Sequence, residues 1–199
     1  MLIPDLKITP LSDSDISLVT EWAKREGFAP GLGDVSIYKN TDNQGLWVAS
    51  LDEKQIGCIA GIKYNISYGF IGLFIVLKEY RGNGYGLELW KHAMSYLENI
   101  PCIGLEAASN RIDDYSKWGF KISSITTRWK WEGNDGFLVD KLYLEDELRG
   151  LKILDVHSIS SNNIQLYDAS RESTARPHFL KDWLNNKTGK VLVIVDESG

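Results

Sequence analysis

The chain has 199 residues, of which 43% are hydrophobic and 25% are charged, enough to bury the core of one full domain and part of another. Its formal net charge is −5 and it has no basic run, which argues against binding to a nucleic-acid backbone and mildly favours a cationic acceptor. Cys58 and Cys102 have no metal-ligand spacing and no disulfide pattern, so we expect two small buried residues in a reducing compartment. Without a leader-like start or an apolar run of membrane-spanning length, the sequence predicts a cytoplasmic protein that does not contact a membrane.

The chain opens with a predicted strand and helix. Residues 6–9 read as a short strand, and the polar run Ser12-Asp13-Ser14-Asp15 supplies cap candidates for a helix that ends at Gly27. The helix carries four apolar residues on one face: Ile16, Val19, Trp22 and Ala23.

A loop and a hairpin follow. The Pro and Gly content of residues 28–34 predicts a loop, and the nearby aromatic residues, including Tyr38, are expected in the core or in a pocket wall. Residues 46–51 and 56–64 predict two antiparallel strands joined around Asp52-Glu53-Lys54.

The strongest local pattern is a strand, a glycine-rich turn and a helix. Residues 69–76 predict a strand buried on both faces, because six of these eight residues are Phe, Ile, Leu or Val. The run Arg81-Gly82-Asn83-Gly84-Tyr85-Gly86 follows, and then a helix with Leu87, Trp90, Met94 and Leu97 on one face. Glycines allow close backbone approach, and the first N–H groups of a helix are unpaired. With the charge of Arg81 added, the pattern predicts a phosphate or diphosphate site.

Two other phosphate-binding patterns fit this turn less well. A Walker loop requires Gly-Lys-Ser/Thr at the start of the helix, and Tyr85-Gly86-Leu87 excludes it. A dinucleotide fold requires a third glycine where this chain has Leu87 or Leu89, although Glu106 lies near the position of a ribose-binding acid. A nucleotide-dependent oxidoreductase therefore stays as a weak alternative, and so does a turn that uses glycine only for its geometry.

The remaining segments extend the alternation of strands and helices. We expect a buried strand over residues 102–107, a short helix within 109–117 and a long strand over 120–131. Together with the earlier elements, this order predicts a mixed α/β fold. The run Gly133-Asn134-Asp135-Gly136 marks a boundary, after which we expect a strand over 164–168, a helix over 176–184 and a strand over 191–195.

Two of these motifs resemble one family. Residues 81–86 match the R/Q-x-x-G-x-G/A signature of the GNAT superfamily of acyl-CoA-dependent N-acyltransferases, and Leu73-Phe74-Ile75-Val76 is similar to its central splayed strand. Tyr115-Ser116-Lys117-Trp118-Gly119-Phe120 is similar to the Y-x-x-x-G-F element of the family. The resemblance implies an α/β (α+β) fold, with a mostly antiparallel central sheet flanked by helices, and acetyl-CoA as co-substrate without a metal.

The resemblance also implies where coenzyme A binds. The main chain around the glycines would hold the diphosphate, through Arg81, Gly82, Asn83, Gly84, Tyr85, Gly86 and Leu87. The exposed strand edges of Phe74, Ile75 and Val76 would pair with the pantetheine amides. The loop after the first helix would line the acceptor pocket, and its candidate residues are Glu26, Phe28 and Asp34.

Amide formation from a thioester requires a neutral amine and an acid for the departing thiolate. Tyr115 is the candidate acid, because its family counterpart protonates the thiolate and a tyrosine stays protonated at neutral pH; it could equally pack under Phe120. Glu106 is the candidate base, since a carboxylate at a buried strand end can have a raised pKa. Glu106 could instead bind the positive charge of the substrate or pair with Arg111.

These features predict two domains and one leading function. Residues 1–135 would form a GNAT domain, and residues 136–199 a linker with either a partial second GNAT-like lobe, as in a tandem bacterial branch, or an appendage. We expect an N-acetyltransferase that acts on the primary amine of a small molecule, which attacks acetyl-CoA directly in a ternary complex. The protein could form a homodimer. The alternative is a non-catalytic acyl-CoA-binding regulatory module.

Overall fold

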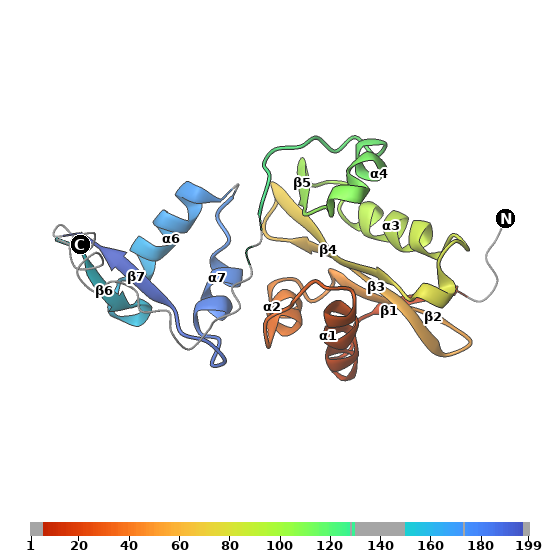
Figure 1. The fold of residues 1–199 in the computed structure, drawn as a ribbon, viewed down its shortest axis with the longest axis horizontal. Coiled ribbons are helices and arrows are strands. Elements are labelled where there is room, and N and C mark those ends of the chain that lie inside the picture. The colour runs from red at the N-terminus through yellow and green to blue at the C-terminus, as the bar shows by residue number, and fades with distance from the viewer. Residues whose placement is uncertain (1–5, 128, 130–149, 173, 197–199) are drawn as a thin grey trace. The chain divides into compact units, whose positions relative to one another are not determined.

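The computed structural model describes residues 6–127, 129, 150–172 and 174–196 (Figure 1). These residues fall into two compact units: the first takes the described residues within Met1–Glu106 and Ile159–Lys190, and the second takes those within Ala107–Ser158 and Val191–Gly199. No helix among the described residues has both the length and the hydropathy that a membrane crossing requires.

The first unit contains a five-stranded sheet in the order β1-β2-β3-β4-β5, antiparallel except for the parallel pair β4–β5. Its strands are β1 (Leu6–Pro10), β2 (Leu46–Leu51), β3 (Lys54–Lys63), β4 (Tyr68–Val76) and β5 (Cys102–Leu105). The predicted hairpin is confirmed: Asp52 and Glu53 both have positive φ, 45° and 66°, as a two-residue type I′ turn requires. The mixed α/β fold predicted from the sequence is thereby confirmed.

Helices cover both faces of this sheet (Figure 1). On one face lie α1 (Ile16–Arg25) and α2 (Asp34–Thr41), and on the other lies α3 (Tyr85–Tyr96). The predicted apolar face of α1 is confirmed by the burial of Val19, Trp22 and Ala23. Helix α2 was not predicted, because its only buried residues are Val35 and Ile37 and the preceding glycines indicate a loop.

Helix α3 forms where the sequence predicts it but turns a different face to the sheet. The buried residues are Leu89, Trp90 and Ala93 of the helix and Leu97 directly after it. Leu87, predicted on the buried face, is 45% exposed because it lies in the first turn of the helix, beside the glycine-rich turn. Trp90 and Leu97 are thus the correctly predicted core positions.

The predictions for the second half of the strand pattern are confirmed only in part, since β5 confirms a strand that begins at Cys102. The strand expected over residues 102–107 ends at Leu105 and pairs only with β4 among the described residues, so Cys102 is exposed rather than buried. Residues 120–127 form no strand, and Ile122 and Ile125 are 66% and 88% exposed. An apolar alternation forms a strand only where a neighbour accepts its backbone hydrogen bonds. Residues 128, 130 and 131 of that predicted strand, and the boundary run at 133–136, lie outside the described residues.

The C-terminal segment contains β6 (Lys152–Asp155), α6 (Ser161–Arg171), α7 (Pro177–Leu184) and β7 (Leu192–Val195). The predicted helix over 176–184 and strand over 191–195 are confirmed by α7 and β7. The strand predicted over 164–168 is wrong, because these residues lie in α6. That helix is capped by Ser160, whose hydroxyl accepts a hydrogen bond from the Asn163 N–H at 3.2 Å.

A hydrogen-bonded carboxylate joins three elements of the first unit. Asp42, at the end of α2, accepts hydrogen bonds from the Tyr96 hydroxyl of α3 at 2.9 and 3.0 Å and from the Lys63 N–H of β3 at 2.8 Å. The Lys63 ammonium lies 3.7 Å from the centroid of the Tyr96 ring. These contacts hold α3 against the sheet at the end of the helix opposite to the glycine-rich turn.

We therefore expect Tyr96→Phe to lower the free energy of unfolding by about 1 to 2 kcal/mol, because a hydrogen bond to a charged group is lost. Denaturant midpoints at constant m-value measure the change. The matched control is Tyr167→Phe, which removes the same hydroxyl from a side chain of α6 that is 66% exposed and should change the stability by less than about 0.5 kcal/mol. Equal effects of the two changes would contradict the role given to the Asp42 contacts.

Candidate active site

The central strand β4 has an open edge over its second half. Its pairing with β5 runs from Tyr68 opposite Cys102 to Ile71 opposite Leu105, and within the described residues it stops there. On the other side β4 stays paired with β3 as far as Val76 opposite Gly57. Apart from the Val76 carbonyl, which accepts a hydrogen bond from Arg81, the backbone groups of residues 72–76 on the β5 side are thus available to a ligand that lies along the strand.

A β-bulge marks the point where this open edge begins. Between the pairs Cys58–Ile75 and Ala60–Gly72, β4 has one residue more than β3, and Leu73 has a positive φ of 46°. Such a backbone conformation costs about 1 kcal/mol or more for a residue with a Cβ and is found where the backbone serves a site. Leu73 also accepts a hydrogen bond from the Cys58 thiol at 3.2 Å.

The glycine-rich turn leads from β4 into the N-terminus of α3. Gly82 and Gly84 have φ values of +82° and +87°, a backbone region that side chains disfavour, and Gly84 is the residue from which the helix starts. The first bond of the helix runs from the Glu88 N–H to the Gly84 carbonyl, so the N–H groups of Tyr85, Gly86 and Leu87 precede it. Their unpaired donors and the helix dipole favour an anion here.

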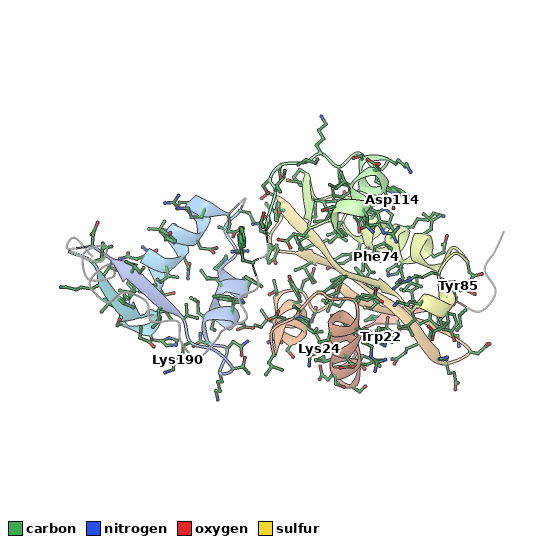
Figure 2. All side chains as sticks on the ribbon, in the orientation of Figure 1. Trp22, Lys24, Phe74, Tyr85, Asp114 and Lys190 are labelled. Atoms are coloured by element: carbon green, nitrogen blue, oxygen red, sulfur yellow. The ribbon has the colours of Figure 1, made fainter. Side chains whose placement is uncertain are left out.

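Packing under the turn fixes its position on the sheet. A Cβ at Gly86 would lie 3.5 Å from both Phe74 and Val76 of β4, and Phe74 packs on Trp90 of α3 with ring centroids 5.9 Å apart. Figure 2 shows Phe74 on the central strand and Tyr85 at the start of α3. The Asn83 side chain donates to the carbonyls of Tyr80 and Arg81 at 3.3 Å and so closes the turn from within.

Arg81 joins this turn to the loop after α1. Its Nε donates to the Val76 carbonyl at 2.7 Å, and its Nη2 forms an ion pair with Glu26 at 2.7 Å. The two contacts use two of the five N–H donors of the guanidinium. Glu26 itself is fixed by the end of α1, where its N–H donates to the Trp22 carbonyl at 3.0 Å. The structure thus brings together two residues that the sequence assigned to different ligands.

The other two candidates for the acceptor pocket lie in the same loop. The Asp34 carboxylate accepts a hydrogen bond from the Gly31 N–H at 2.8 Å and closes the turn that precedes α2. Phe28 is 41% exposed, and its N–H donates to the Ala23 carbonyl at 2.9 Å. Their contribution to acceptor binding stays a prediction.

Glu106 directly follows β5, one residue after the point where β5 leaves β4. The sequence placed it at a buried strand end, which is wrong: Glu106 is exposed, because β5 is paired on one side only in the described part of the chain. Arg111, considered as its ion-pair partner, pairs with Asp114 at 3.1 Å. The carboxylate is therefore open to a substrate at the beginning of the open edge of β4.

Tyr115 lies in the second unit, in the short helix α4 (Ile112–Ser116). Its ring meets that of Phe120 edge to face, with centroids 6.3 Å apart, as the packing interpretation expected. Partial burial raises the pKa of Tyr115 above its ordinary value of 10.0, with the Asp114 carboxylate adding to the shift and Arg111 opposing it. The hydroxyl thus stays protonated at neutral pH, as an acid requires, and its catalytic role stays a prediction.

Apart from Tyr38, which the sequence predicted in the core or in a pocket wall, the structure also reveals residues near the site that the sequence did not single out. The Lys54 ammonium lies 5.2 Å from the centroid of the Tyr80 ring, and Tyr80 lies 6.5 Å from Tyr85, so a cation stands beside the glycine-rich turn. The tyrosines Tyr38, Tyr64 and Tyr68 form a second group, described below. Neither group has a sequence signal, because its members come from distant segments.

One hollow lies away from the open edge of β4. A hollow of about 620 Å³ at the end of α2 is lined by Asp13, Lys39, Asn40, Thr41, Asp42 and Asn43, none of which belongs to β4 or its turn. Among the residues that the structure describes, no group of three or more His, Cys, Asp or Glu side chains is placed to hold a metal ion.

The sequence and the fold are similar to those of known proteins. The chain is 26% identical over 193 residues to the holothin acyltransferase of Pseudoalteromonas sp. (strain SANK 73390), a match that covers 96% of this chain and 61% of that protein. It resembles the structure of a putative acetyltransferase from Pyrococcus horikoshii, with a TM-score of 0.69, 17% identity and coverage of 96% of this chain and 66% of that one. It also resembles the structure of Ard1 from Thermoplasma volcanium, with a TM-score of 0.54 and 23% identity. That match covers 60% of this chain and 84% of the Ard1 chain.

The chain thus spans about three fifths of the curated relative and about two thirds of the Pyrococcus protein. The profile of the acetyltransferase (GNAT) family matches residues 16–120, a range that contains α1, the whole of β4 and the glycine-rich turn. Because this match covers more than half of the 199 residues, the chain belongs to the GNAT family of acetyltransferases, enzymes that use acetyl-CoA as co-substrate.

Proposed function

We propose that this protein transfers the acetyl group of acetyl-CoA to the primary amine of a small molecule, by direct attack in a ternary complex. One observation carries the proposal: the open edge of β4 leads, through the short 3₁₀ helix Lys78–Tyr80, into a turn whose N–H groups suit a diphosphate. Family membership and a relative named as an acyltransferase of holothin support it.

In this proposal coenzyme A lies along the strand and the turn. The N–H groups of residues 82–87 bind the diphosphate, and the free edge of Phe74, Ile75 and Val76 pairs with the pantetheine amides. The thioester then reaches the bulge at Leu73, where β4 and β5 separate. Arg81 contributes charge to the diphosphate site while its pair with Glu26 holds the acceptor loop nearby.

The chemical step requires one base and one acid. Glu106 takes a proton from the ammonium, directly or through water, and the neutral amine attacks the thioester carbonyl carbon. The C–N bond forms, the C–S bond breaks, and the departing thiolate takes the proton of the Tyr115 hydroxyl. A covalent route through Cys58 is disfavoured, because complete burial raises the pKa of its thiol far above the ordinary value.

The C-terminal residues support the predicted second lobe. The order strand, short 3₁₀ turn, helix, helix, strand occurs twice, first over residues 6–51 and again over 152–195, and in each case the two strands pair antiparallel. We propose that residues 1–135 form the GNAT domain and that 136–199 contain a linker and part of a second GNAT-like lobe. The proposal requires that the backbone of residues 152–195 superimpose on that of residues 6–51.

The function is tested by thiol release from acetyl-CoA with a panel of primary amines that includes 2-phenylethylamine, ethanolamine, spermidine and free amino acids. We expect turnover with at least one member at a rate well above that without an amine, and formation of the N-acetyl product by mass spectrometry. Tight binding of acetyl-CoA without turnover by any amine would contradict the enzymatic proposal and favour a regulatory module.

Gly82→Ala tests the diphosphate site. The change places a methyl group in open space at a residue with φ +82°, so we expect the chain to fold but to bind coenzyme A at least about tenfold more weakly, as measured by calorimetry. Gly119→Ala is the control for backbone strain, because Gly119 has φ +88° and equally open surroundings. A similar loss of coenzyme A affinity in both variants would show that strain alone is responsible.

Tyr115→Phe tests the acid. Removal of the hydroxyl should lower kcat about 10²-fold or more while the dissociation constant of acetyl-CoA changes less than about threefold. Because the pKa of Tyr115 is raised, the loss of its proton should limit the wild-type rate only above pH 10. An unchanged kcat in the variant would show that another group, or water, protonates the thiolate.

A further inference from the structure

Phe179 of α7 lies between two tyrosines of the first unit. Its ring centroid is 6.1 Å from that of Tyr38 on α2 and 5.5 Å from that of Tyr64, which it meets edge to face at 88°. Tyr64 in turn stacks on Tyr68, at the start of β4, at 6.2 Å. All four residues are half-buried, and together we call them the aromatic wall. A half-buried aromatic surface with polar tips is typical of a small-molecule site.

The segment that carries Phe179 is fixed to three elements of the same unit. Its anchoring hydrogen bonds are those of Asn65 Nδ2 to Thr174 Oγ1 and the Ala175 carbonyl, of Asn40 Nδ2 to Asp182 Oδ2, and of Asn186 Nδ2 and Thr188 Oγ1 to the Leu32 carbonyl. These partners belong to the turn between β3 and β4, to α2, and to the loop that precedes α2. Residues 174–188 therefore form part of the surface made by the predicted acceptor loop.

The aromatic wall borders the strand that ends at Glu106. A Cβ at Gly104 would lie only 2.2 Å from the Tyr68 hydroxyl, so this hydroxyl covers β5 two residues before Glu106. On the other side, Asp34 is the first residue of α2 and lies four positions before Tyr38 on the same helix. Burial raises the pKa of Tyr38, and the carboxylates of Asp34 and Glu106 add to the shift, while a hydrogen bond with Tyr64 and the charge of Arg176 oppose it. The wall and the proposed base thus both lie at the end of β5.

The charges around the wall favour a cation. Arg176 lies 5.0 Å from the Phe179 ring, but its guanidinium is paired with Asp168 at 3.0 Å and with Glu172 at 2.9 Å. Two carboxylates thus stand against the single charge of Arg176, and Asp34 and Glu106 add two further acids on the Tyr38 side, where Arg176 still lowers the pKa of Tyr38. An ammonium beside aromatic rings and carboxylates is stabilised both by the ring faces and by the opposite charges.

We propose that the aromatic wall, completed by Phe179 from the C-terminal segment, is the acceptor subsite, and that it selects primary amines whose non-reacting part is aromatic or apolar. This inference rests on the proposed function and specifies its acceptor. The rings pack against the body of the acceptor, while Asp34 and Glu106 attract its ammonium toward the thioester. Phe179 acts here as a specificity-determining residue and takes no part in the chemical step.

The test compares 2-phenylethylamine with ethanolamine as acceptors of the full chain. We expect the wild type to have a higher kcat/KM for 2-phenylethylamine. Phe179→Ala should lower that value at least tenfold, mainly through KM, and should change kcat/KM for ethanolamine less than threefold. Phe179→Leu, which keeps most of the apolar volume, should recover part of the loss. The dissociation constant of coenzyme A should stay within twofold in both variants, because Phe179 lies outside the diphosphate site.

Trp183→Ala is the matched control, since Trp183 is an aromatic residue of the same helix that is 46% exposed. Its ratio of kcat/KM values for the two amines should equal that of the wild type. The inference is overturned if Phe179→Ala behaves as Trp183→Ala does, or if the wild type prefers ethanolamine. Either result leaves the acetyltransferase proposal intact, whereas absence of turnover with every amine of the panel rejects that proposal itself. If Phe179→Ala does not fold, the same comparison is made with Phe179→Leu.

Discussion

The site depends on the separation of β4 from β5. As long as two strands are paired, each satisfies the backbone groups of the other, and no ligand can use them. After Ile71 that constraint is lifted on one side of β4, while β3 still holds the strand on the other side. An extended ligand can therefore take the position of the missing strand. Because the same strand continues into the glycine-rich turn, one ligand can bind both the strand edge and the helix N-terminus.

The sequence predicted those parts of the site that local interactions determine. An apolar run, three glycines and an amphipathic helix are adjacent in the chain, so strand, turn and helix follow from backbone preferences and periodicity alone. The hairpin and α1 were predicted for the same reason. By contrast, Ile164 and Leu166 alternate as in a strand, yet they lie in α6, whose cap at Ser160 and length favour the helix. Residues 120–127 show that the alternation also requires a partner strand.

The tertiary part of the site could not be predicted in this way. Arg81 and Glu26 are 55 positions apart, and Asn65 and Ala175 are 110 positions apart, so no spacing rule connects them. Exposure of Glu106 also depends on whether another strand follows β5, which no local pattern decides. The repeated order of elements gives a partial explanation for the aromatic wall: α2 and α7 occupy the same place in the two repeats, and these equivalent helices pack on each other.

The ion pair between Arg81 and Glu26 has a consequence for how the protein behaves in solution. Both side chains are partly exposed, and pairs of this kind weaken as counter-ions accumulate. The loop after α1 and the turn before α3 are joined by this contact, so ionic strength acts on both at once. At high salt the bond from Arg81 to the Val76 carbonyl persists and keeps the turn on its strand, while the loop after α1 loses its ionic link to that turn.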